Sequence, residues 1–233
     1  MAVSCDPDAV ATNAVEFLLP FFIGPTVFAY TRHRLPAIPV LWALMAYCLF
    51  ILLRDPAFDR ESLWNAAPLG HFAPAILRLF AVVAMIGIVL VRRFGAPGLF
   101  LNLPRSNPRL WSLLMVLYPV LSVYPQGIVY RAFVFDRYRD LFGAPWAIVL
   151  ASAFAFTYVH IVFRNRLALV LTLLGGILFG IRFLQTDSLL VTSFEHSLYG
   201  CFMFTVGVGR SFHHASARET ETNGQRFPRN TAS

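Results

Sequence analysis

The sequence has few charged residues and no lysine. Asp, Glu, Lys and Arg make up 13% of its 233 residues, and all nineteen basic residues are arginine. Soluble domains carry about 25% charged residues, so this composition excludes an ordinary soluble domain. The net charge of +7 does not indicate nucleic-acid binding, because the arginines lie at the ends of apolar runs. We therefore expect the lipid bilayer as a partner, and no nucleic acid.

Cysteine is also scarce. The chain has three cysteines, Cys5, Cys48 and Cys201, which are far apart and form no Cys-x-x-Cys pair. This pattern excludes a disulfide framework and a zinc knuckle. The first ten residues hold two aspartates and no basic residue, so we do not expect a cleavable signal peptide.

Long apolar runs are what the sequence does have, and 58% of its residues are hydrophobic. Seven runs approach the roughly 20 residues that a helix needs to cross a bilayer, and their length and continuity exclude spanning strands. We predict an all-α fold, a polytopic membrane helix bundle of about seven transmembrane helices. It forms one domain over residues 1–210, followed by a polar tail, 211–233, predicted to be disordered and cytoplasmic. The runs are 13–30, 36–53, 73–91, 110–135, 145–163, 167–184 and 188–208.

The distribution of arginine predicts the orientation. With the amino terminus outside, twelve of the nineteen arginines lie in inner loops or in the tail, as the positive-inside rule requires. Several of the seven outer arginines have an aspartate close by in the sequence, for example Asp55 near Arg54. We predict an integral membrane protein with its amino terminus outside and its carboxyl tail in the cytoplasm.

One apolar run contains an unusual polar group of residues. Pro125, Gln126, Gly127 and Arg131 lie within seven positions of the fourth run. A charge at membrane depth is costly and usually faces a protein interior or a wet cavity. Either Arg131 extends along a proline-kinked helix to the lipid head groups, or this helix carries polar groups into an intramembrane site.

Two histidines lie inside later runs, His160 in the fifth and His196 in the seventh. They are either buried histidines bonded to neighbouring groups, or they converge in the bundle as metal ligands or as an acid and a base. Glu195 precedes His196 directly, so on a helix its side chain points about 100° away from the imidazole.

These residues resemble three motifs of the CAAX protease and bacteriocin-processing (CPBP) family of intramembrane endopeptidases. The family's first motif, Glu-Glu-x-x-x-Arg, falls on residues 126–131; the second, Phe-x-x-x-His, on Phe156 to His160; and the third, His followed four residues later by a small or amide residue, on His196 to Gly200. A bacterial branch reads Pro-Gln-Glu in the first motif and Glu-His-x-Leu-Tyr-Gly in the third. The resemblance covers about residues 110–212, and its bacterial branch implies a protein of a bacterial inner membrane.

The resemblance implies a site made of Gln126, Gly127, Arg131, His160, Glu195 and His196, acting on a hydrophobic or membrane-tethered peptide. Arg131 would orient the site or a substrate carboxylate, while His160 and His196 would bind the attacking water, the oxyanion or a divalent metal such as zinc. Both motif glutamates are missing, however, because Gln126 and Gly127 occupy their positions. Gln126 cannot accept a proton from water near neutral pH, and two histidines are fewer than the three protein ligands usual in catalytic zinc sites.

Three hypotheses follow. The chain is an intramembrane peptidase, or a non-catalytic relative that binds a peptide or partner protein in the membrane. The third and most remote hypothesis is a membrane protein that binds haem through His160 and His196.

Overall fold

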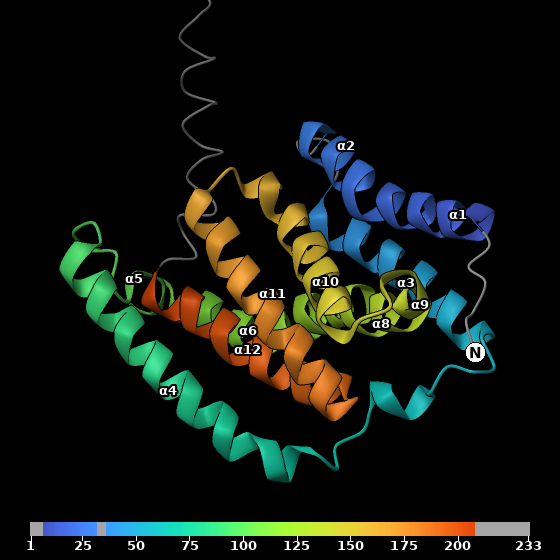
Figure 1. Cartoon of the computed structure of the whole chain (residues 1–233). Coiled ribbons are helices and arrows are strands. Elements are labelled where there is room, and N and C mark those ends of the chain that lie inside the picture. The colour runs from blue at the N-terminus through green and yellow to red at the C-terminus, as the bar shows by residue number, and fades with distance from the viewer. Residues whose placement is uncertain (1–6, 32–35, 208–233) are drawn as a thin grey trace, which may run out of the picture.

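The computed structural model describes residues 7–31 and 36–207, and every regular element in these two ranges is a helix (Figure 1). The predicted all-α fold class is therefore confirmed. The predicted tail, residues 211–233, lies outside the described residues. The elements in chain order are α1 Pro7–Leu18, η1 Leu19–Ile23, α2 Gly24–Thr31, α3 Ala37–Arg54, η2 Arg60–Leu63, α4 Leu69–Phe94, α5 Asn102–Ser106, α6 Pro108–Tyr118, η3 Pro119–Val123, α7 Tyr124–Gly127, η4 Ile128–Phe133, α8 Val134–Arg137, α9 Arg139–Phe142, α10 Pro145–Val159, η5 His160–Phe163, α11 Arg166–Thr186 and α12 Leu189–Val206.

The apolar runs of the sequence coincide with the long helices. Within the described residues, 6 helices are long and apolar enough to cross a membrane, and their ends lie within a few residues of the first six predicted runs. The seventh run is α12, which is not among these six and carries Glu195, His196 and several hydroxyl side chains. Large apolar side chains stay exposed on the outer helices, as on α4, which lies along α12 at the edge of the bundle (Figure 1). The chain is thus an integral membrane protein whose outer surface suits lipid.

The helix from Pro108 to Arg137 runs through the bundle and carries the whole first motif. It is not uniformly α-helical, because the π-helical segments η3 and η4 flank the single α-helical turn α7. Pro125 has no N–H to give the carbonyl of Leu121 four residues earlier. The indole Nε1 of Trp42 in α3 donates to that carbonyl instead, at 3.0 Å. Segments of π-helix are rare and often occur at functional sites.

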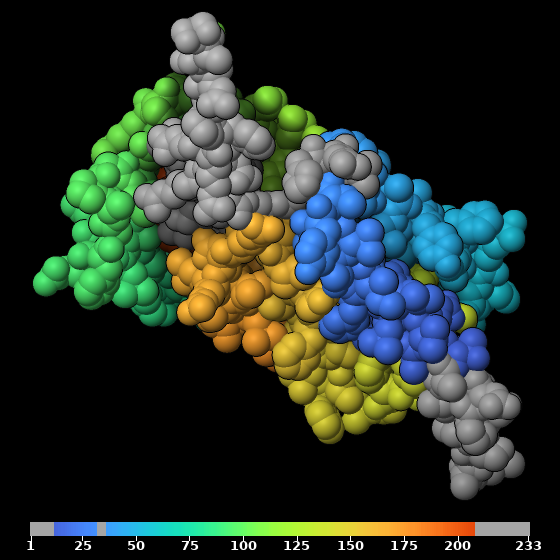
Figure 2. Space-filling view, turned by 90° about the horizontal axis from the view of Figure 1, so that it is seen from above, coloured from blue at the N-terminus to red at the C-terminus, as the bar shows by residue number. Residues whose placement is uncertain are grey.

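Neighbouring helices approach closely through small residues. A Cβ atom added at Gly176 of α11 would lie 3.0 Å from the Cα of Ala153 in α10, and one at Gly180 would lie 3.2 Å from Cγ1 of Val149. These glycines therefore allow α10 and α11 to pack backbone against backbone. The segment α1 to α2 packs on α10 from another side, and Figure 2 shows these blue helices beside the yellow and orange ones.

The polar stretch between α3 and α4 is folded onto the motif helices. The hydroxyl of Tyr124 donates to the carbonyl of Leu63 at 3.0 Å, and the Trp64 ring stacks on the Tyr124 ring with centroids 4.9 Å apart. The Ser188 hydroxyl at the start of α12 donates to the carbonyl of Asn65 at 2.5 Å. The stretch is therefore tied both to α7 and to α12.

Candidate functional site

Arg131 lies in the interior of the bundle between two aromatic rings. Its side chain projects from η4, the residue is 1% exposed, and every residue of η4 is buried. The guanidinium carbon is 4.2 Å from the centroid of the Phe156 ring in α10 and 5.5 Å from that of Phe179 in α11. Such contacts favour a cation. Arg131 is therefore held inside the bundle, and the interpretation in which it extends to lipid head groups is wrong.

The Arg131 guanidinium has no hydrogen-bond partner among the described residues. Its Nε, Nη1 and Nη2 atoms are buried, and none of them bonds to another group in the described part of the chain. Two other buried polar atoms near the first motif share this state, Oε1 of Gln126 and Oγ of Ser193. Buried polar groups normally find partners, so several unpartnered atoms around one motif mark this region as a place where a ligand or water would bind.

His160 lies at the end of α10, where the helix passes into the 3-10 segment η5. Its Nδ1 is 2.6 Å from the carbonyl oxygen of Phe156, one turn earlier, and its ring centroid is 4.8 Å from that of Phe156. Since a carbonyl oxygen can only accept, Nδ1 donates, and in the neutral imidazole Nε2 then carries the lone pair. The spacing Phe-x-x-x-His thus places the imidazole against the same ring that carries Arg131.

His196 is buried on α12 and meets the same two rings. Its imidazole stacks on the Phe179 ring, with centroids 4.5 Å apart. It is nearly perpendicular to the Phe156 ring, and these two centroids are 5.5 Å apart. The Tyr118 ring of α6 is also nearly perpendicular to the imidazole, with centroids 6.4 Å apart. A Cβ atom at Gly200, one turn after His196, would collide with the Tyr118 ring. The small residue of the third motif therefore lets Tyr118 lie beside the histidine.

Gln126 and Gly127 occupy the positions of the missing glutamates, one turn before Arg131. Nε2 of Gln126 donates to the hydroxyl of Ser122 at 2.7 Å, which leaves Oε1 as a free acceptor. Gly127 is buried against α12, where an added Cβ would lie 2.8 Å from Cδ1 of Leu189 and 3.3 Å from Oγ of Ser193. The glycine position is therefore filled by neighbouring side chains, and a larger residue there requires Leu189 to move.

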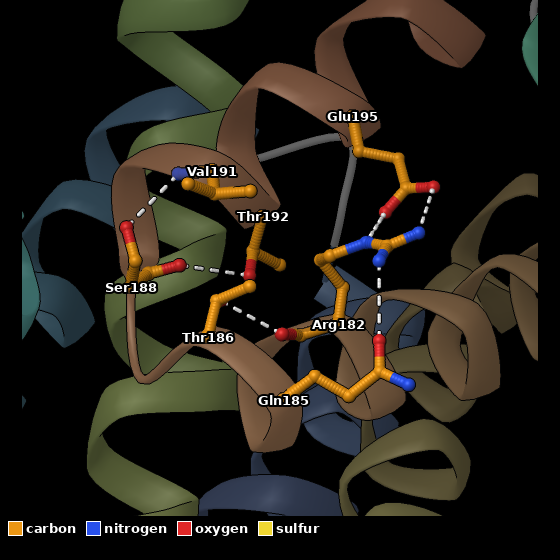
Figure 3. Close-up of polar contacts among 7 residues, drawn as sticks. All are labelled: Arg182, Gln185, Thr186, Ser188, Val191, Thr192 and Glu195. Atoms are coloured by element: carbon orange, nitrogen blue, oxygen red, sulfur yellow. Dashed lines mark hydrogen bonds and ion pairs between the residues drawn. The ribbon is translucent and has the colours of Figure 1, made fainter. Parts of the chain in front are cut away.

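Glu195 is committed to an ion pair that points away from the histidines. Its carboxylate accepts from Nε of Arg182 at 2.8 Å and from Nη2 at 3.3 Å, and Nη1 of Arg182 donates to Gln185 at 3.1 Å (Figure 3). The side chains of Arg182 and Glu195 are only 11% and 0% exposed. The pair joins α11 to α12, and this explains how a fully buried carboxylate is tolerated. Glu195 therefore lies outside the Arg131 cluster, which we define as Arg131, His160, His196, Phe156 and Phe179.

An apolar cavity of about 900 Å³ lies along the first-motif helix at Tyr124, Pro125 and Ile128, and no residue of the Arg131 cluster is among the described residues that line it. Its walls include residues of α3, η2, α4, η3, α7, η4 and α12. Ser193 lines the cavity and also lies against the Gly127 position of the first motif. Arg60 is the only charged residue in its wall. The residues that line it are Trp42, Met45, Leu49, Leu53, Arg60, Leu63, Trp64, Leu69, Pro119, Val120, Tyr124, Pro125, Ile128, Leu190, Ser193, Phe194 and Ser197.

The predicted metal pair, His160 and His196, gains no third ligand from the described residues. Within those residues, no three or more His, Cys, Asp or Glu side chains are grouped so that they could hold a metal ion. The donor set therefore does not fit a catalytic zinc site, which needs three protein ligands.

The structure thus gathers Arg131, His160 and His196 around the Phe156 ring, with Gln126 and Gly127 on the preceding turn. It separates Glu195 from them. Two residues of the cluster were not identified as site residues by the sequence. Phe156 could have been, because it opens the second motif at helical spacing from His160, whereas nothing distinguishes Phe179 among the 23 phenylalanines.

The family to which part of the chain is similar is shown by comparison with protein-family models. A family model described as type II CAAX prenyl endopeptidase Rce1-like matches residues 108–202, from the start of α6 to α12. The matched stretch contains all three motifs and all five residues of the Arg131 cluster, so the predicted family is confirmed over this part of the chain. No curated protein and no solved structure matches.

Proposed function

Since residues 108–202 carry the sequence of a CAAX-protease-like membrane family, we propose that this protein binds a hydrophobic or membrane-tethered peptide within the bilayer and does not cleave it efficiently. The observation that carries the proposal is the absence of a carboxylate from the Arg131 cluster. Gln126 and Gly127 stand at the positions of the family glutamates. Glu195, the acidic residue next to His196, is paired with Arg182. Hydrolysis of a peptide needs a group that takes a proton from water.

The cavity supports peptide binding. Ligand sites are typically apolar clefts of about 300–1,000 Å³ with a few polar groups at defined places. The cavity has this size and an apolar wall with aromatic residues, and Ser193 offers a hydroxyl where it meets the first motif. Apolar side chains of a peptide would fill the cavity, and Ser193 would lie between the peptide and the Gly127 turn of the first motif.

Two polar groups of the first motif have the donor and acceptor atoms that a peptide backbone needs. Oε1 of Gln126 can accept from an amide N–H, and the Arg131 guanidinium can donate to a carbonyl or a carboxylate oxygen. Neither atom has another partner among the described residues. This arrangement binds the ground state of a peptide without requiring that any bond be broken.

A second candidate is a slow peptidase in which an imidazole replaces the missing glutamate. The observation in its favour is the bond from Nδ1 of His160 to the Phe156 carbonyl, which leaves Nε2 with a lone pair. In this mechanism Nε2 takes a proton from water, the resulting hydroxide attacks the peptide carbonyl, and Arg131 or His196 stabilises the oxyanion. The proton then passes from Nε2 to the leaving amine. A histidine base is common in enzymes, so the two candidates must be separated by experiment.

The test uses purified full-length protein in lipid nanodiscs and a fluorescent hydrophobic reporter peptide, with binding and cleavage measured in parallel. We expect binding without cleavage. The matched variants are Gly127→Glu with Leu189→Ala and Gly127→Gln with Leu189→Ala. In both, the alanine makes room for the new side chain, and only the first restores a carboxylate. Cleavage should rise by about 10²–10⁴-fold in the Glu variant, and the Gln variant should stay inactive.

The outcomes distinguish the candidates. If the unaltered chain cleaves the peptide and His160→Ala abolishes cleavage while binding is kept, the imidazole peptidase is correct. If the unaltered chain neither binds nor cleaves any hydrophobic peptide, the proposed function is wrong.

A further inference from the structure

We propose that the outward face of α4 binds a transmembrane helix of another protein, and that Arg78 pairs there with an Asp or Glu side chain of that helix. The helix α4, Leu69–Phe94, precedes the stretch matched by the family model, residues 108–202. This interaction is separate from the proposed peptide binding, and either can fail without the other.

Arg78 is a charge inside the apolar part of a membrane span. The twenty residues from Phe72 to Val91 contain Arg78 and no other charged residue, and they match the roughly 20 residues that cross a bilayer. With a rise of 1.5 Å per residue, Arg78 lies about 9 Å along the axis from Phe72 and about 20 Å from Val91. Its α-carbon is therefore at hydrocarbon depth, where charged side chains are rare and usually have a functional partner.

Arg78 points away from the bundle. The bundle side of α4 carries Ile76 and Ala84, which are buried, and Phe80, whose ring packs on aromatic rings of α12. At 100° per residue, Arg78 is turned by about 160° from the middle of this side, and the residue is exposed. No hydrogen bond or ion pair joins it to another group in the described part of the chain.

Arg182 shows how this protein satisfies a charge on an apolar helix. Its guanidinium pairs with the carboxylate of Glu195 on the neighbouring helix, at 2.8 Å. Arg78 carries the same charge without such a neighbour, because α12 packs on the opposite side of α4 (Figure 1). A guanidinium binds a carboxylate through two parallel hydrogen bonds. A second membrane helix can hold a carboxylate at the depth of Arg78, whereas lipid phosphates stay at the bilayer surface.

The surface around Arg78 suits the close approach of a helix. Among the six candidate spans of the described residues, α4 is the least covered: 6% of its apolar stretch is buried, against 17% or more in the other five. The exposed face that carries Arg78 combines one small residue with three large apolar ones, Ala81, Val82, Met85 and Val89. A small residue lets helix backbones approach closely, and the larger side chains provide packing area.

A second copy of this chain suits this face less well. In a symmetric dimer, the same patch of both copies meets, so one Arg78 would lie beside the other without a carboxylate between them. Like charges repel strongly in a medium of low dielectric constant. The charge of the face therefore favours a different protein, one that carries an acidic residue at this depth.

The test uses the full-length protein in vesicles of neutral phosphatidylcholine, with fluorescent single-span peptides as probes. One peptide carries Glu at about the seventh position of an apolar stretch of about 20 residues, and its matched control has Gln there. A third carries its Glu outside the apolar stretch, at head-group level. Association is measured by energy transfer from a dye on the protein. We expect the first peptide to associate about fivefold to thirtyfold more strongly than the other two, as for polar bonds between membrane helices.

Two variants assign the preference to Arg78. Arg78→Met should associate with the Glu and Gln peptides equally, at the level of the unaltered protein with the Gln peptide. Its unfolding midpoint should not fall, because Arg78 bonds to no described group, and it should bind the hydrophobic reporter peptide as the unaltered protein does. Arg93→Met removes an exposed cation at the end of the same helix and should keep the full preference.

Each other result overturns the inference. Equal association of the Glu and Gln peptides with the unaltered protein leaves Arg78 without the proposed partner, and a preference that survives in Arg78→Met places the carboxylate contact elsewhere. Enrichment of phosphatidylglycerol around the protein that depends on Arg78, without a preference for Glu, makes a lipid phosphate the ligand. Energy transfer between labelled copies of the protein that exceeds transfer to the Glu peptide makes a second copy the occupant. Failure to bind the reporter peptide overturns only the proposed function.

Discussion

The buried ion pair between α11 and α12 allows a quantitative prediction. In Arg182→Met, the carboxylate of Glu195 keeps a position with 0% side-chain exposure and loses both of its bonds to the guanidinium. Breaking a buried pair by removing one partner typically costs about 3–5 kcal/mol, because the other charge is left without compensation. We therefore expect the free energy of unfolding of Arg182→Met to fall by about that amount.

The chain contains a matched control in the ion pair between Arg137 and Glu16. Its N–O distance of 2.9 Å is nearly the same, but the two side chains are 42% and 30% exposed. Exposed pairs contribute about 0.2–1 kcal/mol, so Arg137→Met should lower the free energy of unfolding by less than about 1 kcal/mol. The two variants make the same substitution and differ mainly in the burial of the partner.

The double variant Arg182→Met, Glu195→Leu completes the test. Replacing both partners of a buried pair by apolar residues is often neutral or stabilising, so the double variant should lie within about 1 kcal/mol of the unaltered protein. It should also bind peptide, if Glu195 stabilises the bundle and takes no part in the site. Unfolding is measured by circular dichroism during titration of mixed micelles with denaturing detergent. The reasoning is refuted if Arg182→Met is no less stable than Arg137→Met.

Three further predictions concern packing and orientation. Trp42→Phe should lower the free energy of unfolding by about 1–3 kcal/mol, because it leaves the Leu121 carbonyl without the indole donor. Adding Pro125→Ala restores a backbone N–H and should recover most of that loss in the same unfolding assay. Gly200→Ala should lower the free energy of unfolding by about 1–3 kcal/mol, because the added methyl group collides with the Tyr118 ring. A variant as stable as the unaltered protein would contradict this packing. The arginine distribution predicts that a cysteine introduced into the tail reacts with an impermeant thiol reagent only after the cells are opened, and labelling in intact cells would reverse the orientation.

The sequence by itself determined the class of protein and the positions of its helices. In a bilayer, the backbone N–H and C=O groups of a long apolar run must bond within the protein, and a helix achieves this within the run itself. The runs therefore coincide with the observed helices. The same local rule predicted that Glu195 points away from His196, because adjacent residues on a helix face different directions. The motif spacing also identified Arg131, His160 and His196, the rare polar residues of the apolar runs.

Only the tertiary structure decided which groups these residues meet. Glu195 pairs with Arg182 on the preceding helix, and Phe179 rather than another phenylalanine lies against both Arg131 and His196. Gly127 proves to be closed off by Leu189 from α12. The physical reason is that helical periodicity fixes only the direction of a side chain from its own axis. What lies in that direction depends on how helices cross, and hence on close approach at glycines and on the π-helical segments that turn the motif helix.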